Sequence, residues 1–183
     1  MKHIIFDLDD TLGELSIPLM HTLNKITKQD FTVADWNSFY ISEMYDMTNE
    51  ELFEAMIDFK LLEKMLPYAD VKDVLTHLKK NHTINIVTAR AWHPDGRNIT
   101  EKWFAKHQIP YDNIVICDVD KSKIDCISTI DDIVLAVDDR DTHCEDFTNY
   151  GKIKKVLMMH QPWNTKESHI ERIHSIKEVL NHI

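Results

Sequence analysis

The sequence predicts an α/β protein whose doubly wound, Rossmann-like parallel sheet is flanked by helices. Five short apolar runs recur along the chain, and four of them are rich in β-branched residues, which is typical of strands buried on both faces of a parallel sheet. The runs cover residues 4–6, 84–87, 114–117, 133–137 and 156–159. Polar stretches alternate with these runs over residues 70–160. This alternation indicates strand–helix–strand units.

Helical segments are expected between the runs and near the C-terminus. The expected helices between strands cover about residues 70–80, 98–107, 121–130 and 142–150. Gly151 follows the last of them, in the position of a helix C-cap. In segment 167–180 the apolar residues are spaced at three and four: Ile170, Ile173, Ile176 and Leu180. This spacing predicts an amphipathic helix that covers the sheet.

Residues 13–68 interrupt the alternation of strands and helices. The segment is long and polar, contains several aromatic residues, and has helical patterns over about residues 17–28 and 48–64. We interpret it as a small helical cap inserted after the first strand. The α/β core then consists of residues 1–12 and 69–183.

The composition restricts the classes of partner. The net charge of −10 argues against nucleic acid backbones and anionic membranes as partners. No apolar run approaches the ~20 residues of a membrane helix, and we expect no signal peptide. The three cysteines lack CxxC spacing, which favours reduced thiols in a cytoplasmic protein. His143 is expected to be a surface residue. A homodimer is compatible with the sequence.

Two of the expected strands end in acidic residues. The first strand leads into Asp7, Asp9 and Asp10 in the stretch HIIFDLDDTL, and a later strand leads into Asp138 and Asp139. Carboxylates this close repel one another, and burying them is costly unless a cation lies among them. Open α/β sheets bind ligands at the carboxyl ends of their strands. The sequence therefore predicts a site for a cation or a reaction at this edge of the sheet.

Two further strand ends contribute hydroxyl and cationic side chains. Thr88, Ala89 and Arg90 follow one strand, and Lys121 and Lys123 follow the next. Carboxylate oxygens hold Mg²⁺, and cationic and hydroxyl donors hold phosphoryl oxygens, so this set of residues suits Mg²⁺ and a phosphate ester. Arg90 fits an ion pair with the acids as well as a substrate contact. The two lysines are alternatives for the phosphate-binding cation, and we prefer Lys121.

A calcium loop and a simple turn cap are the structural alternatives for the stretch DLDDTL. An EF-hand needs glycine and glutamate at positions where this chain has Leu12 and Pro18, so the calcium loop is excluded. Capping of a strand-to-helix turn would explain Asp7 and Asp9, but not the acids at the end of a second strand.

The motifs and their order resemble those of the haloacid dehalogenase (HAD) superfamily. Its D-x-D-x-T motif is similar to residues 7–11, and its second motif to Thr88 after an apolar strand. Its third motif is a lysine, and its fourth is similar to Asp138-Asp139. The resemblance covers the whole predicted sheet domain and implies the same α/β fold.

The resemblance also implies roles for individual residues. Asp7 would be the nucleophile that forms an aspartyl-phosphate, and Asp9 would be the acid for the leaving group and then the base for water. Thr88 and Lys121 would hold the phosphate, with Ala89, Arg90 and Lys123 as further substrate contacts. The expected metal is Mg²⁺, and its expected site consists of Asp7, Asp9 (through its backbone carbonyl), Asp138 and Asp139.

Within the superfamily, the cap and the stretches VTAR and HQPWN resemble the 5′(3′)-deoxyribonucleotidase group. This implies hydrolysis of nucleoside monophosphates, with aromatic side chains of the cap around the nucleobase. Trp36 and Tyr40 are candidates for that pocket, although their spacing also fits a buried helix face. The stretch AVDDRD resembles the phosphatase part of phage polynucleotide kinase/phosphatases, so a polynucleotide 3′-phosphatase is an alternative. Two further alternatives are a phosphatase of another small metabolite and a non-catalytic binding protein.

Overall fold

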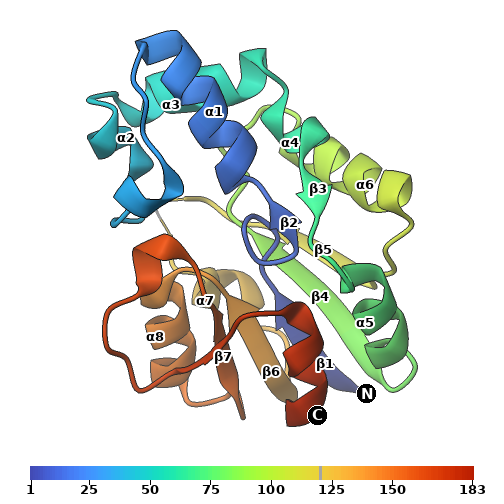
Figure 1. Ribbon diagram of the computed structural model, residues 1–183. Coiled ribbons are helices and arrows are strands. Elements are labelled where there is room, and N and C mark those ends of the chain that lie inside the picture. Colours follow the sequence, from blue (N-terminus) through green and yellow to red (C-terminus); the bar gives the residue numbers. More distant parts are fainter. Residues whose placement is uncertain (120) are drawn as a thin grey trace.

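The computed structural model describes residues 1–119 and 121–183, which form a six-stranded sheet (Figure 1). Neighbouring strands are parallel and follow the order β5-β4-β1-β6-β7-β8. The strands are β1 (Lys2–Phe6), β4 (His82–Thr88), β5 (Asn113–Ile116), β6 (Ile133–Asp138), β7 (Val156–Met159) and β8 (Glu171–Ile173). The predicted α/β fold with a doubly wound parallel sheet is confirmed. No helix in the described residues is long and apolar enough to cross a membrane.

Helices cover both faces of the sheet, as the apolar central strand requires. Ile4 and Phe6 of β1 belong to a core that includes side chains of α5 and α6, whereas Ile5 belongs to a second core with side chains of α7 and α8. Successive strand residues point to opposite faces, so burying all three needs a helix layer on each side. These helices are α5 (Val71–Leu78), α6 (Gly96–His107), α7 (Lys123–Ile127) and α8 (Asp141–Tyr150).

A helical insertion lies between β1 and β4. The short strands β2 (Gly13–Glu14) and β3 (Leu66–Pro67) pair in antiparallel and bring its two ends together. Between them lie α1 (Ser16–Thr27), η1 (Val33–Asp35), α2 (Ile41–Met44), α3 (Asn49–Asp58) and α4 (Leu61–Lys64). Figure 1 shows these helices, in blue to turquoise, grouped at one end of the sheet. The helix expected over residues 48–64 is divided, because the chain turns at Lys60, whose φ is 53°.

The C-terminal segment differs from the expected amphipathic helix. It forms strand β8 and then a 3-10 helix, η3 (Ile176–His182). Ile173 packs in the same core as Met159 of β7, whereas Ile170 packs with Met158 on the other face of the sheet. The spacing of three and four therefore extends over two different elements. Pairing with the otherwise open edge of β7 outweighs the helical periodicity of the segment.

Candidate active site

The candidate site lies where the strand order of the sheet reverses. From β1 the chain continues to β4 and β5 on one side, and it then returns to β6, β7 and β8 on the other side. Asp7 directly follows β1, and its backbone N–H donates to the Val137 carbonyl of β6 at 2.9 Å. Thr88 ends β4, and Asp138 ends β6. Such switch points leave a crevice at the carboxyl ends of the strands, and residues of three neighbouring strands meet there.

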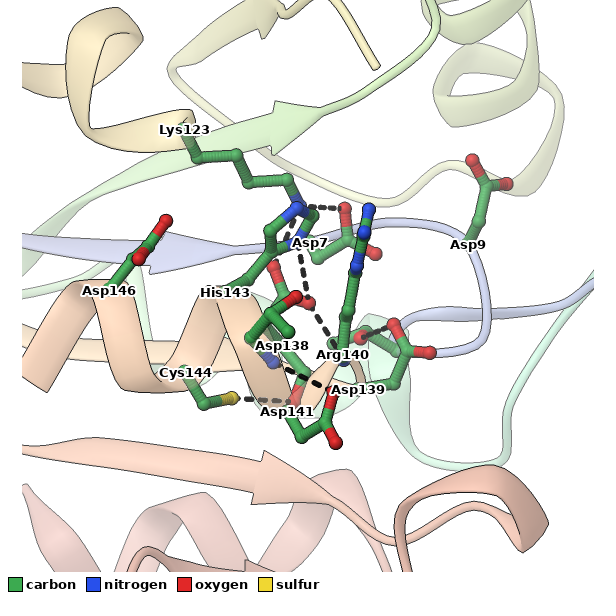
Figure 2. Close-up of polar contacts among 12 residues, drawn as sticks. Asp7, Asp9, Lys123, Asp138, Asp139, Arg140, Asp141, His143, Cys144 and Asp146 are labelled. Atoms are coloured by element: carbon green, nitrogen blue, oxygen red, sulfur yellow. Dashed lines mark hydrogen bonds and ion pairs between the residues drawn. The ribbon is translucent and has the colours of Figure 1, made fainter. Parts of the chain in front are cut away.

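Three buried carboxylates form the centre of the site. Oxygen atoms of Asp7, Asp138 and Asp139 all lie within 4.8 Å of one another. The Asp9 carboxylate lies apart from them, as Figure 2 shows. Four acids are expected to hold the metal, and the structure brings together the side chains of three of them. An oxygen-only set of ligands suits a hard cation such as Mg²⁺.

Lys123 places its ammonium group between two of these carboxylates. Its Nζ donates to Asp7 Oδ1 at 2.5 Å and to Asp138 Oδ2 at 2.7 Å, and its side chain is 3% exposed (Figure 2). The local fold explains this reach. Asp7 follows Ile5 by two residues, so both side chains point to the face of the sheet that α7 covers. Lys123 is the first residue of α7.

Lys121, which the sequence analysis preferred, does not occupy this position. Its side chain is 67% exposed, and its Nζ lies 3.8 Å from an Asp118 carboxylate oxygen. Ser122, between the two lysines, caps α7 by accepting a hydrogen bond from Ile124 N, and the helix begins immediately after it. Of the two lysines, Lys123 thus faces the sheet and Lys121 faces solvent. The preference is corrected in favour of Lys123.

Burial perturbs the ionisation of the cluster. Burial raises the pKa of Asp7 to about 7; Lys123 opposes this shift, and the neighbouring acids add to it. Burial and the charges of Asp138 and Asp7 hold the pKa of Asp139 well above its ordinary value. Burial also acts to raise the pKa of Asp138, but Lys123 and His143 outweigh it and hold this pKa below its ordinary value. One ammonium group therefore does not neutralise three carboxylates, and the cluster fits an additional cation.

Asp9 lies on the other side of the site, against Arg90. The Nε of Arg90 donates to Asp9 Oδ2 at 2.9 Å, and its Nη2 donates to Oδ1. The Asp9 side chain is 24% exposed and lines the cavity described below, whereas Arg90 is fully buried behind it. Of the two roles expected for Arg90, the structure shows the ion pair with Asp9. The expected substrate contact is corrected, because the buried guanidinium does not line the cavity. Thr88 and Ala89 do line the cavity.

A layer of side chains behind the acids holds them in place, a role that was not expected from the sequence. Trp163 Nε1 donates to Asp139 Oδ2 at 3.0 Å, and Asn164 Nδ2 donates to the Asp139 carbonyl at 2.6 Å. His143, expected at the surface, is instead buried, and its Nδ1 lies 3.3 Å from Asp138 Oδ1. The sequence contains a signal for this position of His143. A helix that begins at Asp141, three residues after the strand ends at Asp138, places its first turn over the end of that strand.

A cavity of about 290 Å³ opens above the carboxylates. Its polar floor contains Asp7, Asp9, Thr88, Ala89, Lys123, Asp138 and Asp139. Its walls are mostly apolar and come from the helical insertion and from loops of the core: Leu15, Leu19, Trp36, Phe39, Tyr40, Leu52, Phe53, Met56, Trp92 and Trp163. The cavity is therefore lined by charged side chains from the strand ends and by aromatic side chains from the insertion and the loops of the core.

The walls join the insertion to the core. Trp36 of the insertion packs against Trp163 of the core, with ring centroids 4.5 Å apart. Tyr40 is half exposed, and its hydroxyl accepts a hydrogen bond from Arg140 at 3.2 Å. The Arg140 guanidinium also lies 4.3 Å from the centre of the Phe39 ring. Trp36 and Tyr40 thus line the cavity, as does Arg140, which the sequence analysis did not single out.

Known nucleotidases are similar to this chain in sequence. The model of the family "5′ nucleotidase, deoxy (Pyrimidine), cytosolic type C protein" matches residues 1–183. A nucleotidase of Clostridium acetobutylicum is 30% identical over 116 residues, which are 62% of this chain and 59% of that protein. The match thus spans about three fifths of the length of that relative.

Solved structures share the fold at low sequence identity. A haloacid dehalogenase-like hydrolase of Streptococcus pneumoniae has a TM-score of 0.68 at 14% identity, over 99% of this chain and 97% of that chain. A HAD hydrolase of Bacillus subtilis, solved with bound magnesium, has a TM-score of 0.64 at 13% identity, over 98% and 97% of the two chains. The match of the family model over residues 1–183 shows that the chain belongs to the deoxy 5′-nucleotidase, cytosolic type C family.

Proposed function

We propose that this chain hydrolyses phosphate monoesters, with nucleoside monophosphates as substrates, through an aspartyl-phosphate on Asp7. The observation that carries the proposal is the position of the Asp7 carboxylate, on the floor of the cavity and 2.5 Å from the Lys123 ammonium. A carboxylate can attack a phosphate ester only where cations offset the negative charge of both groups. Membership of the family supports the reaction class, and the name of the Clostridium relative supports the substrate class.

The buried acids support a divalent metal as cofactor. Asp7, Asp138 and Asp139 would hold Mg²⁺, because they offer oxygen ligands and the lysine among them pairs with only two, Asp7 and Asp138. When bound, Mg²⁺ would supply charge neutralisation for the phosphoryl oxygens and orient the ester. The raised pKa of Asp7 and of Asp139 indicates negative charge that burial leaves poorly compensated. A cation in this place would relieve that repulsion.

The chain's own residues can perform both proton transfers. In the first step an Asp7 oxygen bonds to phosphorus, the ester P–O bond breaks, and Asp9 gives its proton to the leaving oxygen. In the second step the ionised Asp9 takes a proton from water, whose oxygen bonds to phosphorus as the Asp7–phosphorus bond breaks. Thr88 and Lys123 would hold phosphoryl oxygens throughout, and Asp9 returns to its initial state.

The aromatic side chains that line the cavity support a ring-containing substrate. Phe53 of α3 stacks on Trp92 of the core, with centroids 4.3 Å apart and planes inclined by 10°. Both rings line the cavity, and aromatic side chains in a cavity wall favour a nucleobase, since stacking on a base contributes roughly 1–3 kcal/mol. The net charge of −10 supports a free nucleotide over a polynucleotide.

A substrate panel tests the proposal. Phosphate release would be measured with Mg²⁺ from deoxyuridine, deoxythymidine and deoxyguanosine 5′-monophosphates, their ribose and 3′-phosphate counterparts, a 3′-phosphorylated oligonucleotide and several sugar phosphates. We expect the highest kcat/KM for a deoxynucleoside monophosphate, and we expect no phosphate release after treatment with EDTA. Preference for the oligonucleotide, with affinity that falls steeply with salt, would instead favour a 3′-phosphatase. Preference for a sugar phosphate would overturn the nucleotide assignment, and no release would overturn the reaction class.

A further inference from the structure

Arg90 is a buried cation whose main contact is the carboxylate at the edge of the cavity. Its guanidinium makes two hydrogen bonds to Asp9, one to each oxygen, and the residue is completely shielded from solvent. A planar guanidinium that binds both oxygens fixes the position and the rotation of the carboxylate. Arg90 itself is not among the residues that line the cavity. It therefore meets a substrate only through Asp9.

The arginine is in turn held from behind by α6. Its Nη1 donates to Thr100 Oγ1 at 3.1 Å, and Thr100 Oγ1 donates to the Gly96 carbonyl at 2.7 Å. The start of α6 packs tightly against the Arg90 backbone, because a Cβ on Gly96 would lie 2.3 Å from the Arg90 carbonyl oxygen. The contacts form a chain of support from α6 to the cavity floor.

We infer that Arg90 is a positioning residue that holds the Asp9 carboxylate where it can exchange a proton with the leaving group and with water. The inference rests on the function proposed above. Asp9 comes after the end of β1, in a loop, and the sheet contacts its carboxylate through one long hydrogen bond, from Thr88 Oγ1 to Asp9 Oδ2 at 3.4 Å. Arg90 is bonded to α6 and supplies further rigidity. Buried, bonded support of this kind is what keeps a reacting group within the narrow range of productive geometries.

The leaving group of the substrate distinguishes positioning from a general structural role. A nucleoside monophosphate releases an alkoxide that needs a proton from Asp9, whereas p-nitrophenyl phosphate releases a stable phenolate that does not. The kcat/KM of each substrate reports the steps up to cleavage of its ester bond. A misplaced Asp9 should therefore lower kcat/KM for the nucleotide far more than for the phenyl ester. A distorted fold should lower both alike.

The experiment compares the wild type with Arg90→Met, Arg90→Lys and Asp9→Asn on both substrates. We expect Arg90→Met to lower kcat/KM for the nucleotide by about 100-fold or more, which is the range of general acid catalysis, and for p-nitrophenyl phosphate by less than about tenfold. Asp9→Asn should show the same selective loss. Arg90→Lys should be intermediate, because lysine keeps the charge but cannot bind both oxygens.

Thr100→Val provides a second variant that leaves Arg90 in place. It removes the acceptor of Arg90 Nη1, and we expect a smaller loss that is again selective for the nucleotide. Thr148→Val is the matched control, because Thr148 makes the same hydrogen bond to a carbonyl one turn back, in α8, where Thr148 Oγ1 donates to Cys144 O at 2.8 Å. This control should leave the ratio of the two kcat/KM values unchanged.

The outcomes separate the inference from the proposed function. A folded Arg90→Met variant with the nucleotide activity of the wild type would overturn the inference. Equal losses on both substrates in the Arg90 and Thr100 variants would also overturn it, because they would indicate a structural role. A wild type that hydrolyses neither compound would overturn the proposed function itself and, with it, this role for Arg90.

Discussion

Replacing Lys123 with methionine should damage both stability and turnover. Methionine keeps most of the apolar stem of the side chain and removes the ammonium that lies 2.5 Å from Asp7 and 2.7 Å from Asp138. Breaking a buried ion pair from one side typically costs about 3–5 kcal/mol. Because the Asp7 carboxyl, whose pKa is about 7, can take up a proton in response, we expect the lower end, ~3 kcal/mol. For a chain of this size that is a fall in Tm of about 6–12 °C.

The activity of the same variant tests the phosphate-binding role of the lysine. Loss of one preorganised donor at a reacting centre costs about 100- to 1,000-fold in kcat, and we expect a loss in this range for Lys123→Met. The assay is phosphate release with saturating Mg²⁺, together with thermal unfolding in the presence and absence of Mg²⁺. Mg²⁺ should recover part of the lost Tm, because it restores positive charge to the cluster, but it should not recover the activity.

Lys121→Met is the matched control. The Lys121 side chain is 67% exposed and its ion-pair distance is 3.8 Å, so its removal should change stability by less than about 1 kcal/mol and leave kcat near that of the wild type. The reasoning is refuted if Lys121→Met loses activity while Lys123→Met keeps it. It is also refuted if Lys123→Met unfolds at the wild-type temperature, because the ion pairs would then contribute nothing.

Two further predictions concern the carboxylates. Asp7→Asn should abolish turnover while the fold survives, because only the nucleophile is lost. An activity of this variant within about tenfold of the wild type would contradict the covalent mechanism, because loss of a covalent nucleophile lowers activity far more than that. The second prediction concerns pH. The pKa of Asp7 is raised from 3.8 to about 7, so without metal its contribution to stability is complete below pH ~4 and is lost as pH rises towards 7. Metal binding needs the ionised form, so the increase in Tm on adding Mg²⁺ should grow between pH 5.5 and 8, and an increase that is constant with pH would contradict this linkage.

The fold could be predicted because its signals are local. Ile4, Ile5 and Phe6 are consecutive apolar residues, and such a run is buried on both faces only in a sheet covered by two helix layers. The structure of the C-terminal segment could not be predicted in the same way. Ile170 and Ile173 are three residues apart, which fits a helix, but Glu171–Ile173 pair with the open edge of β7 as a strand. That competition depends on a distant element, which a local pattern does not contain.

The candidate site was predictable in its acids and less so in its cations. Asp7 and Asp138 follow apolar strands directly, so their position at one edge follows from the parallel sheet. The choice between Lys121 and Lys123 depends on where α7 begins, and Ser122 as N-cap was the signal that could have decided it. The burial of Arg90 depends on α6, and no spacing near Arg90 reveals which way its guanidinium points.

The two faces of the sheet divide the chemistry of the site. Lys123 of α7 and His143 of α8 approach Asp7 and Asp138 from the face that carries Ile5. The support of Asp9 comes from Arg90 and α6, and α6 packs on the opposite face. The nucleophile with its compensating charges and the proton-transfer group are therefore supported from opposite faces of the sheet. The two groups remain coupled through charge, because the Asp9 carboxylate adds to the raised pKa of Asp7.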